Sequence, residues 1–309
     1  MAGADPERHA RARAIRGPTW DPTRAGVRLA RPQLGTFRIG TVLSRSLSIY
    51  GRNVLPFVVI SLVVHLPLFA YLTYGGEFYR PSEDERPDIG RLFTSLQMVS
   101  AYAQIGLALI VSGPLTYGVF EQLRGRRPSL PACVRAGLRS VPRVLGVGLI
   151  LLFMVVGLLV GLFFAIVVLA LLGLGPRNLL FEWGVVVGTA FAFGAFFCRH
   201  AVAVPAAVVE RTSPGIALFR SRVLTRANAW RVFGLGFLVY LMSFGVSIVL
   251  TLATGGTLGP RPRFALLVDA IVGASLWVPL LAVALAVCYH DLRVSAEGVD
   301  TEELARVFE

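Results

Sequence analysis

The chain has 309 residues, of which 55% are hydrophobic and only 16% are charged, and its formal net charge is +12. This apolar share exceeds that of a soluble domain, and several apolar runs are longer than the roughly 18–20 residues that cross a hydrocarbon core. The positive charge does not indicate nucleic acid, because the arginines lie in short segments that flank the apolar runs. We therefore expect an all-α membrane protein built as a six-transmembrane-helix bundle.

The predicted organisation has three parts. Residues 1–36 contain seven arginines and no apolar period, which is typical of a disordered cytosolic tail. A six-span membrane domain is expected over residues 37–290, followed by a polar cytosolic tail over residues 291–309. The expected spans are residues 54–74, 93–119, 144–173, 181–208, 231–253 and 264–289.

The arginines are distributed unequally between the two sides of these spans. Six spans place both termini on one side, and 24 of the 30 arginines lie in the segments on that side, against 6 in the three opposite loops. Loops rich in Lys and Arg stay in the cytoplasm. The sequence therefore predicts that the N- and C-termini are both cytoplasmic.

Segment 205–231 joins the fourth and fifth expected spans. Ser213 followed by Pro214 favours a helix start at this point. Apolar residues then recur at helical spacing, with arginines mainly on the other side: Ile216, Phe219, Val223, Ala227 and Trp230 against Arg220, Arg222 and Arg226. This pattern predicts a basic amphipathic helix on the bilayer surface. Pro205 is expected to bend the end of the preceding span.

The same arrangement recurs along the chain. Arg45-Ser46 precedes Asn53 by the distance that separates Arg220-Ser221 from Asn228. In the middle copy, whose surface helix is expected to start after Ser129, the corresponding residues are Arg135 and Arg143. These matches predict a three-fold internal repeat of surface helix, span, outer loop and returning span. The alternative is that cytosolic loops are simply basic and amphipathic.

Residues that carry chemistry are few. No HExxH motif, P-loop, GxSxG motif or metal-spaced histidine cluster is present, so we expect no enzyme, cofactor or metal. Ionisable residues inside spans are functional candidates because their burial is costly. They are His65, Arg199, His200 and Asp269.

Each of these candidates has a structural alternative. His65 is expected as a neutral imidazole bonded to a neighbouring helix, Arg199 as a snorkelling side chain, and Asp269 at the interface or paired with Arg261 or Arg263. Glu210 is expected to pair with Arg220 or Arg226 as a structural latch. The spacings Gly157-x3-Gly161 and Gly184-x3-Gly188 predict close helix contacts.

Three strings resemble the bacterial membrane proteins related to the glycerophosphoryl diester phosphodiesterase membrane domain. They are FRIGTVLSRSLSIYGRNVLPF, VPAAVVERTSPGIALFRSRVLTRANAWRVF and YHDLRVSAEGVDTEEL, and the resemblance covers about residues 37–304. It implies a six-span protein of the bacterial inner membrane, and we expect the catalytic domain found in some members to be absent. The matching positions are Pro205, Glu210, Arg220, Ser221, Tyr289, Asp291, Leu292, Arg293, Glu297, Gly298 and Asp300.

The leading functional hypothesis is a non-catalytic membrane protein that binds lipid headgroups or acts as a scaffold or in lipid handling. Anionic membrane lipids are the expected partners, and a further protein partner is left open. The residues expected to hold headgroups or form the latch are Glu210, Arg220, Ser221, Arg222, Arg226 and Asn228, and the C-terminal motif adds Tyr289, Asp291, Arg293, Glu297 and Asp300. A small-solute transporter or channel with a polar path through His65, Asp269 and Arg199 is the alternative. An enzyme with Asp291, Glu297, Asp300 and Glu210 around a metal is a third hypothesis.

Overall fold

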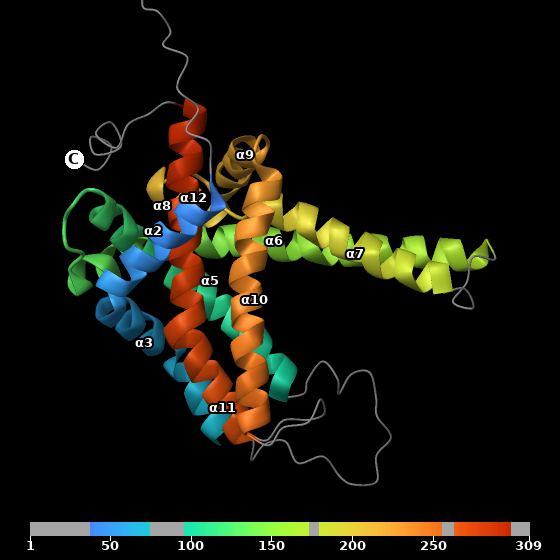
Figure 1. Cartoon of the computed structure of the whole chain (residues 1–309), viewed down its shortest axis with the longest axis horizontal. Coiled ribbons are helices and arrows are strands. Elements are labelled where there is room, and N and C mark those ends of the chain that lie inside the picture. The colour runs from blue at the N-terminus through green and yellow to red at the C-terminus, as the bar shows by residue number, and fades with distance from the viewer. Residues whose placement is uncertain (1–37, 75–95, 173–178, 255–262, 298–309) are drawn as a thin grey trace, which may run out of the picture. The chain divides into compact units, whose positions relative to one another are not determined.

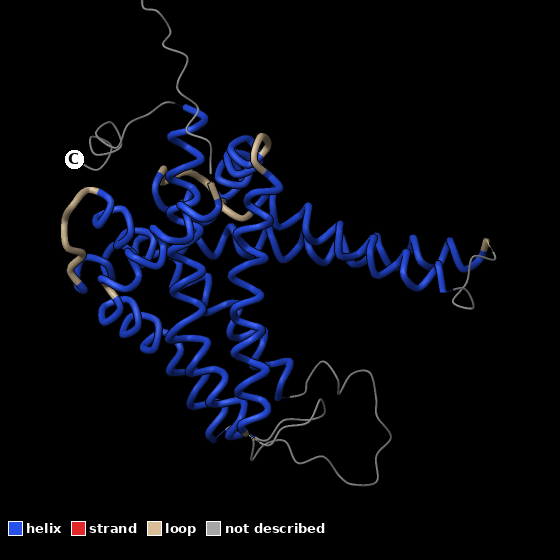
Figure 2. Tube along the Cα trace, in the orientation of Figure 1, coloured by secondary structure: helices blue, strands red, loops and turns tan. Residues whose placement is uncertain are grey.

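A computed structural model describes residues 38–74, 96–172, 179–254 and 263–297, and these residues are helical apart from short turns (Figures 1 and 2). The expected tail over residues 1–36 lies outside them. The α-helices are α2 (Ile39–Arg52), α3 (Val54–Tyr74), α5 (Leu96–Leu123), α6 (Leu130–Leu171), α7 (Leu179–His200), α8 (Ala203–Val209), α9 (Pro214–Thr225), α10 (Ala229–Ala253), α11 (Arg263–Val272) and α12 (Val278–Glu297). A π-helix, η2 (Gly273–Trp277), joins α11 to α12.

Six helical segments are long and apolar enough to cross a membrane: Val54–Tyr74, Met98–Leu123, Leu130–Leu171, Trp183–Val209, Ala229–Ala253 and Arg263–Glu297. Each overlaps one of the spans predicted from the apolar runs, with ends that differ by a few residues in several cases. The described residues include no strand. The prediction of an all-α bundle with six membrane-spanning helices is confirmed.

The first and third predicted repeat units have the same break between surface helix and span. Asn53, between α2 and α3, has φ −126° and ψ 27°, and Asn228, between α9 and α10, has φ −124° and ψ 22°. The middle unit differs because its surface helix and its span form one continuous helix of 42 residues, α6. Arg143 stands there in place of the asparagine and does not interrupt the helix. The prediction of a separate middle surface helix was therefore wrong.

The fourth and sixth spans are each interrupted, the fourth close to Pro205, where a bend was expected. The fourth is interrupted at Ala201 and Val202, between α7 and α8. Pro205 lies three to four residues further on, and its ring excludes the carbonyl of the preceding turn from a helical position. The sixth is interrupted by η2, where the Tyr50 hydroxyl donates a hydrogen bond to the Ser275 carbonyl.

The helix of the last span continues beyond the expected end of that span at residue 289. The polar tail was expected from residue 291, but α12 continues to Glu297. Arg293 and Glu297, one helical turn apart, form an ion pair with 2.9 Å between Nε and Oε2. Such a pair stabilises an additional turn of helix, so the helix extends into the segment that sequence composition marks as polar.

The main core is formed by buried side chains of α2, α3, α5, α6, α8, α9, α10 and α12, and the largest fully buried ones include Phe57, Leu115, Leu235, Tyr289 and Leu292. The second half of α6 and the first half of α7 contribute little to this core. Large apolar side chains on both remain exposed, among them Leu159, Phe163, Phe164, Val187 and Phe191. In a membrane these side chains would contact lipid.

Glycine contacts differ from those predicted. A Cβ atom at Gly157, Gly161, Gly184 or Gly188 would have no neighbour within 4 Å, so the predicted close contacts there were wrong. The close approach lies between α5 and α6, where a Cβ on Gly137 would lie 2.7 Å from Cδ of Pro114. Small residues at that crossing allow the two backbones to pack together.

Candidate functional site

Glu210, which follows α8, is the centre of a network of polar side chains. Arg220 on α9 donates from Nε to both Glu210 carboxylate oxygens, at 3.1 and 3.0 Å, and from Nη2 to Oε1 at 3.0 Å. Tyr289 on α12, which is fully buried, donates its hydroxyl to the same Oε1 at 2.7 Å. The predicted pair between Glu210 and Arg220 is therefore present, and its hydrogen bonds raise the pKa of Arg220 above its usual range.

The end of α12 is held by both surface helices. Arg220 on α9 also donates to Glu297, and Arg45 on α2 donates from Nη1 to Oδ1 of Asp291 at 3.2 Å. Arg45 and Arg220 are the matching arginines of the first and third repeat units. Figure 1 shows α2, α8 and α9 grouped around this end of α12, in agreement with the contacts between these elements. The network therefore joins the first and third units to the last span.

Arg220 was expected either to form a structural latch with Glu210 or to bind lipid headgroups, and this geometry supports the latch. The side chains of Arg220 and Glu210 are 27% and 13% exposed, and the guanidinium is occupied by two carboxylates, Glu210 and Glu297. Two carboxylates already neutralise the charge of this guanidinium, so a lipid phosphate would have to compete with them for it.

Two further predicted residues of segment 205–231, Ser221 and Arg222, contact α7. Ser221 is fully buried and donates to the Arg199 carbonyl at 2.9 Å. Arg222 donates from Nε to Nε2 of His200 at 3.0 Å, and Nδ1 of His200 donates to the Phe196 carbonyl at 2.8 Å. Because Nε2 accepts a hydrogen bond, the proton of His200 is on Nδ1 and the imidazole is neutral.

The apolar stripe of α9 faces away from the protein. Ile216, Phe219 and Val223 are exposed by 50% or more, as is Trp230 at the start of α10, whereas Ala217, Leu218 and Leu224 on the opposite side of α9 are buried. Arg222 and Arg226 are exposed. Asn228 accepts a hydrogen bond from Arg231 at 2.9 Å between Oδ1 and Nη1. An exposed apolar stripe beside exposed arginines is the arrangement of a helix that lies in a membrane interface.

The remaining polar candidates do not come together. His65 is buried and Nδ1 donates to the Ser61 carbonyl of its own helix at 2.8 Å, so the predicted bond to a neighbouring helix was wrong. Asp269 accepts from Ser247 on α10 at 3.3 Å, and Arg199 is exposed. These contacts join His65 to its own helix and Asp269 to α10, and neither of them indicates a polar path through the bundle.

The C-terminal acids also have separate partners. Asp291 contacts Arg45 and His290, whereas Glu297 contacts Arg220 and Arg293. Asp300 lies outside the described residues. Among the residues that are described, no group of three or more His, Cys, Asp or Glu side chains has the geometry of a metal site.

A cavity that the sequence did not predict lies where α5 and α6 meet the segment after α8. Its volume is about 660 Å³, and its lining includes six arginines and a single carboxylate. The arginines are Arg124, Arg126, Arg135, Arg139, Arg143 and Arg211, and the carboxylate is Glu121, which pairs with Arg124 at 3.2 Å. We call this the arginine cavity. The signal for it was the run of six arginines in residues 121–143, but periodicity does not show that they face one hollow.

Four of the six arginines that line the arginine cavity have no acidic partner among the described residues. Within this part of the chain, Arg126, Arg135, Arg139 and Arg143 have no hydrogen bond or ion pair with a carboxylate. Arg135 and Arg139 are one helical turn apart, a spacing at which like charges repel. A bound anion would remove this repulsion.

Arg211 reaches the arginine cavity at a cost in backbone strain. Its φ is 51°, and among the described residues it is the only one besides glycine with positive φ. This left-handed conformation costs an L-residue with a Cβ roughly 1–2 kcal/mol. Backbone strain of this kind is frequent at ligand sites, where the surrounding structure maintains it.

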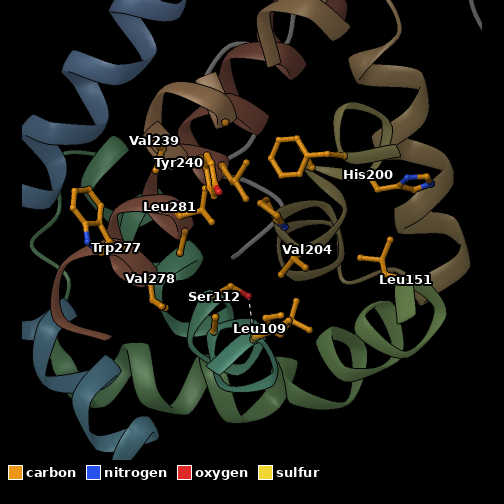
Figure 3. Close-up of a pocket in the computed structure, with 18 of the residues that line it drawn as sticks. Leu109, Ser112, Leu151, His200, Val204, Val239, Tyr240, Trp277, Val278 and Leu281 are labelled. Atoms are coloured by element: carbon orange, nitrogen blue, oxygen red, sulfur yellow. Dashed lines mark hydrogen bonds between the residues drawn. The ribbon is translucent and has the colours of Figure 1, made fainter. Parts of the chain in front are cut away.

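A second cavity, of about 560 Å³, lies between the spans (Figure 3). We call it the apolar cavity. Its walls come from α5, α6, α7, α8, α10, η2 and α12, and Leu109, Leu151, Val204, Val239, Trp277, Val278 and Leu281 are among the side chains that line it. Ser112 and His200 are polar residues on its wall.

The fold and these sites together define an all-α, multi-pass membrane protein with one strongly basic cavity and one apolar cavity. Comparison of the chain with protein-family models, with curated proteins and with solved structures gives no match. The function is therefore argued from the geometry alone.

Proposed function

We propose that this membrane protein binds the phosphate of an anionic phospholipid in the arginine cavity, as a non-catalytic lipid-binding or lipid-handling protein. The observation that carries the proposal is the gathering of six arginines with one carboxylate around one hollow. Arginine suits this ligand because its planar guanidinium donates two parallel hydrogen bonds to phosphate oxygens. The proposed location is the bacterial cytoplasmic membrane, with both termini cytoplasmic.

The position of the cavity relative to the spans supports a lipid ligand. Arg124 and Arg126 follow directly after the apolar helix α5, and Arg143 precedes the long apolar part of α6. The cavity therefore lies at the polar ends of two membrane-spanning helices, at the level where headgroups lie. Each arginine near an anionic leaflet contributes about 1 kcal/mol of attraction.

The resemblance to the phosphodiesterase-related membrane domain stays a prediction. In its favour, Glu210, Arg220, Tyr289, Arg293 and Glu297, which carry that resemblance, form one connected network. The network gives the two distant motifs a shared structural role. We propose that this role is to fix α9 and α12 beside the basic face of the protein.

Replacing Arg135 and Arg139 together by glutamine is expected to weaken binding of phosphatidylglycerol about 25-fold, since two contributions of about 1 kcal/mol are lost. The measurement is native mass spectrometry of the delipidated protein in detergent, titrated with phosphatidylglycerol and, separately, with phosphatidylcholine. Inorganic phosphate is titrated in a third arm to distinguish a site for free phosphate from a site for lipid.

The matched control replaces Arg52 and Arg127 by glutamine, because both are exposed and neither lines the cavity. This variant has the same net charge and is expected to bind phosphatidylglycerol like the unaltered protein. Equal losses in the two variants would show that affinity follows total charge, and the proposal would be wrong. Equal affinity for the two lipids would also contradict it.

Replacing Arg211 by glycine is expected to separate stability from binding. Glycine adopts positive φ without strain, so the midpoint of thermal unfolding should stay the same or rise by a few degrees. Affinity for phosphatidylglycerol should nevertheless fall about fivefold, because one cavity arginine is lost. Differential scanning fluorimetry and the lipid titration give the two values. A variant that is more stable and binds equally well would remove Arg211 from the site.

A further inference from the structure

Most of the wall of the apolar cavity is hydrocarbon, and its polar atoms are few; besides Ser112, Thr116 and His200 they belong to Tyr240, Ser243 and Trp277. The Ser112 hydroxyl donates to the Leu109 carbonyl of its own helix, the bond drawn in Figure 3, and Thr116 donates to the Ser112 carbonyl at 2.7 Å. Both nitrogens of His200 are occupied, by Phe196 and Arg222. A polar solute entering here would lose most of its hydrogen bonds to water without replacement. The chemistry of the walls therefore selects a hydrocarbon ligand.

The surroundings of the cavity indicate where that hydrocarbon comes from. The walls belong to membrane-spanning helices, so the nearest hydrocarbon is the bilayer. At about 560 Å³ the cavity is within the range of single-ligand pockets, roughly 300–1,000 Å³. Walls of Leu, Val, Phe and Trp side chains from several helices suit one flexible acyl chain.

The positively charged side chain of Arg222 lies beside the apolar cavity. Arg222 donates to His200, a wall residue, and its other contact is the sulfur of Met154 at 3.9 Å. Both partners are neutral, and within the described residues Arg222 has no carboxylate partner. This distinguishes it from Arg220, whose guanidinium two residues earlier is bound by two carboxylates. Arg222 is also exposed, next to the apolar stripe of α9.

We propose that the apolar cavity holds one acyl chain of a membrane phospholipid whose phosphate is bound by Arg222. The chain fills the space between the spans, and the headgroup lies at the surface beside α9. This site is distinct from the arginine cavity, because the residues that line the two do not overlap. The inference therefore does not depend on the proposed function.

The experiment uses the whole protein in nanodiscs with a phosphatidylglycerol that carries a diazirine near the middle of one acyl chain. After irradiation, labelled peptides are identified by mass spectrometry. Labels are expected on the cavity walls at Leu109, Val204 and Leu281, at several times the yield on Phe163, which is 62% exposed on α6. Equal yields on the walls and on Phe163 would show ordinary bilayer contact and overturn the proposal.

Two pairs of variants test the chain and the headgroup separately. Ala108→Phe fills the cavity and should lower labelling of its walls about tenfold, whereas Ala101→Phe, on the same helix outside the cavity, should leave it unchanged. Leu281→Trp, which also fills the cavity, is used in its place if the Ala108→Phe variant does not fold. Unchanged wall labelling in a folded, filled variant would refute the proposal.

Arg222→Gln should lower wall labelling by the phospholipid about fivefold. It should not change labelling by an uncharged diazirine alcohol of the same chain length. Equal losses for both probes would show a purely structural effect and would refute the phosphate contact. Arg135→Gln with Arg139→Gln should leave the wall labelling unchanged, so failure of this inference is distinguishable from failure of the arginine cavity.

Discussion

Replacing Gly137 by leucine is expected to destabilise the bundle by about 3 kcal/mol, or to lower the midpoint of thermal unfolding in detergent by about 10 °C. A Cβ at this position would lie 2.7 Å from both Cγ and Cδ of Pro114 on α5. The proline ring is rigid and belongs to a neighbouring membrane-spanning helix, so it cannot rotate away. The two helices would have to separate, and the contacts at their crossing would be lost.

The same substitution at Gly157, on the same helix, is the matched control. Nothing lies within 4 Å of a Cβ there, so Gly157→Leu should leave the midpoint unchanged or raise it slightly through its better helix propensity. Differential scanning fluorimetry of both purified variants gives the comparison. Equal midpoints in the two variants would mean that the crossing of α5 and α6 does not depend on Gly137.

The contrast between these glycines shows what sequence patterns miss. Gly157 and Gly161 have the small-residue spacing that permits helix contact, yet both face away from the protein. Gly137 has no glycine partner at that spacing, and its small size matters because Pro114 of another helix lies opposite. Spacing along one helix does not specify which helix lies opposite or how close it comes. The six spans were predictable because length and hydropathy are properties of each segment alone.

The site shows the same division between local and long-range information. The pairing of Glu210 with Arg220 was predicted because the two are ten residues apart across a turn and carry opposite charges. The contacts of Tyr289 and Glu297 with the same pair were not, because they depend on where α12 ends relative to α9. Arg135 and Arg139 were recognised as basic residues, but their shared cavity requires the position of Arg211, more than 70 residues further on.

Replacing Glu210 by glutamine is expected to be as disruptive as the change at Gly137, at about 3 kcal/mol. The removal of one partner from a buried ion pair costs about 3–5 kcal/mol, and both the 27% exposure of Arg220 and its remaining contact with Glu297 place the value at the lower end. Glutamine has the same shape, but its amide N–H₂ would face donors of Arg220. Tyr289, which is fully buried, would compete for the one remaining acceptor oxygen.

Asp291→Asn is the control for this prediction, because it also removes one carboxylate from an ion pair at the end of α12. Its partner Arg45 is 41% exposed, so water replaces the lost contact and the expected cost is below about 1 kcal/mol.

The double variant that combines Glu210→Gln with Tyr289→Phe tests the network directly. Glu210 and Tyr289 share one hydrogen bond, so the two single losses should not add, and the unfolding midpoint of the double variant should lie above the additive value. Strict additivity would show that the two residues act independently, and the network would then consist of separate pairs.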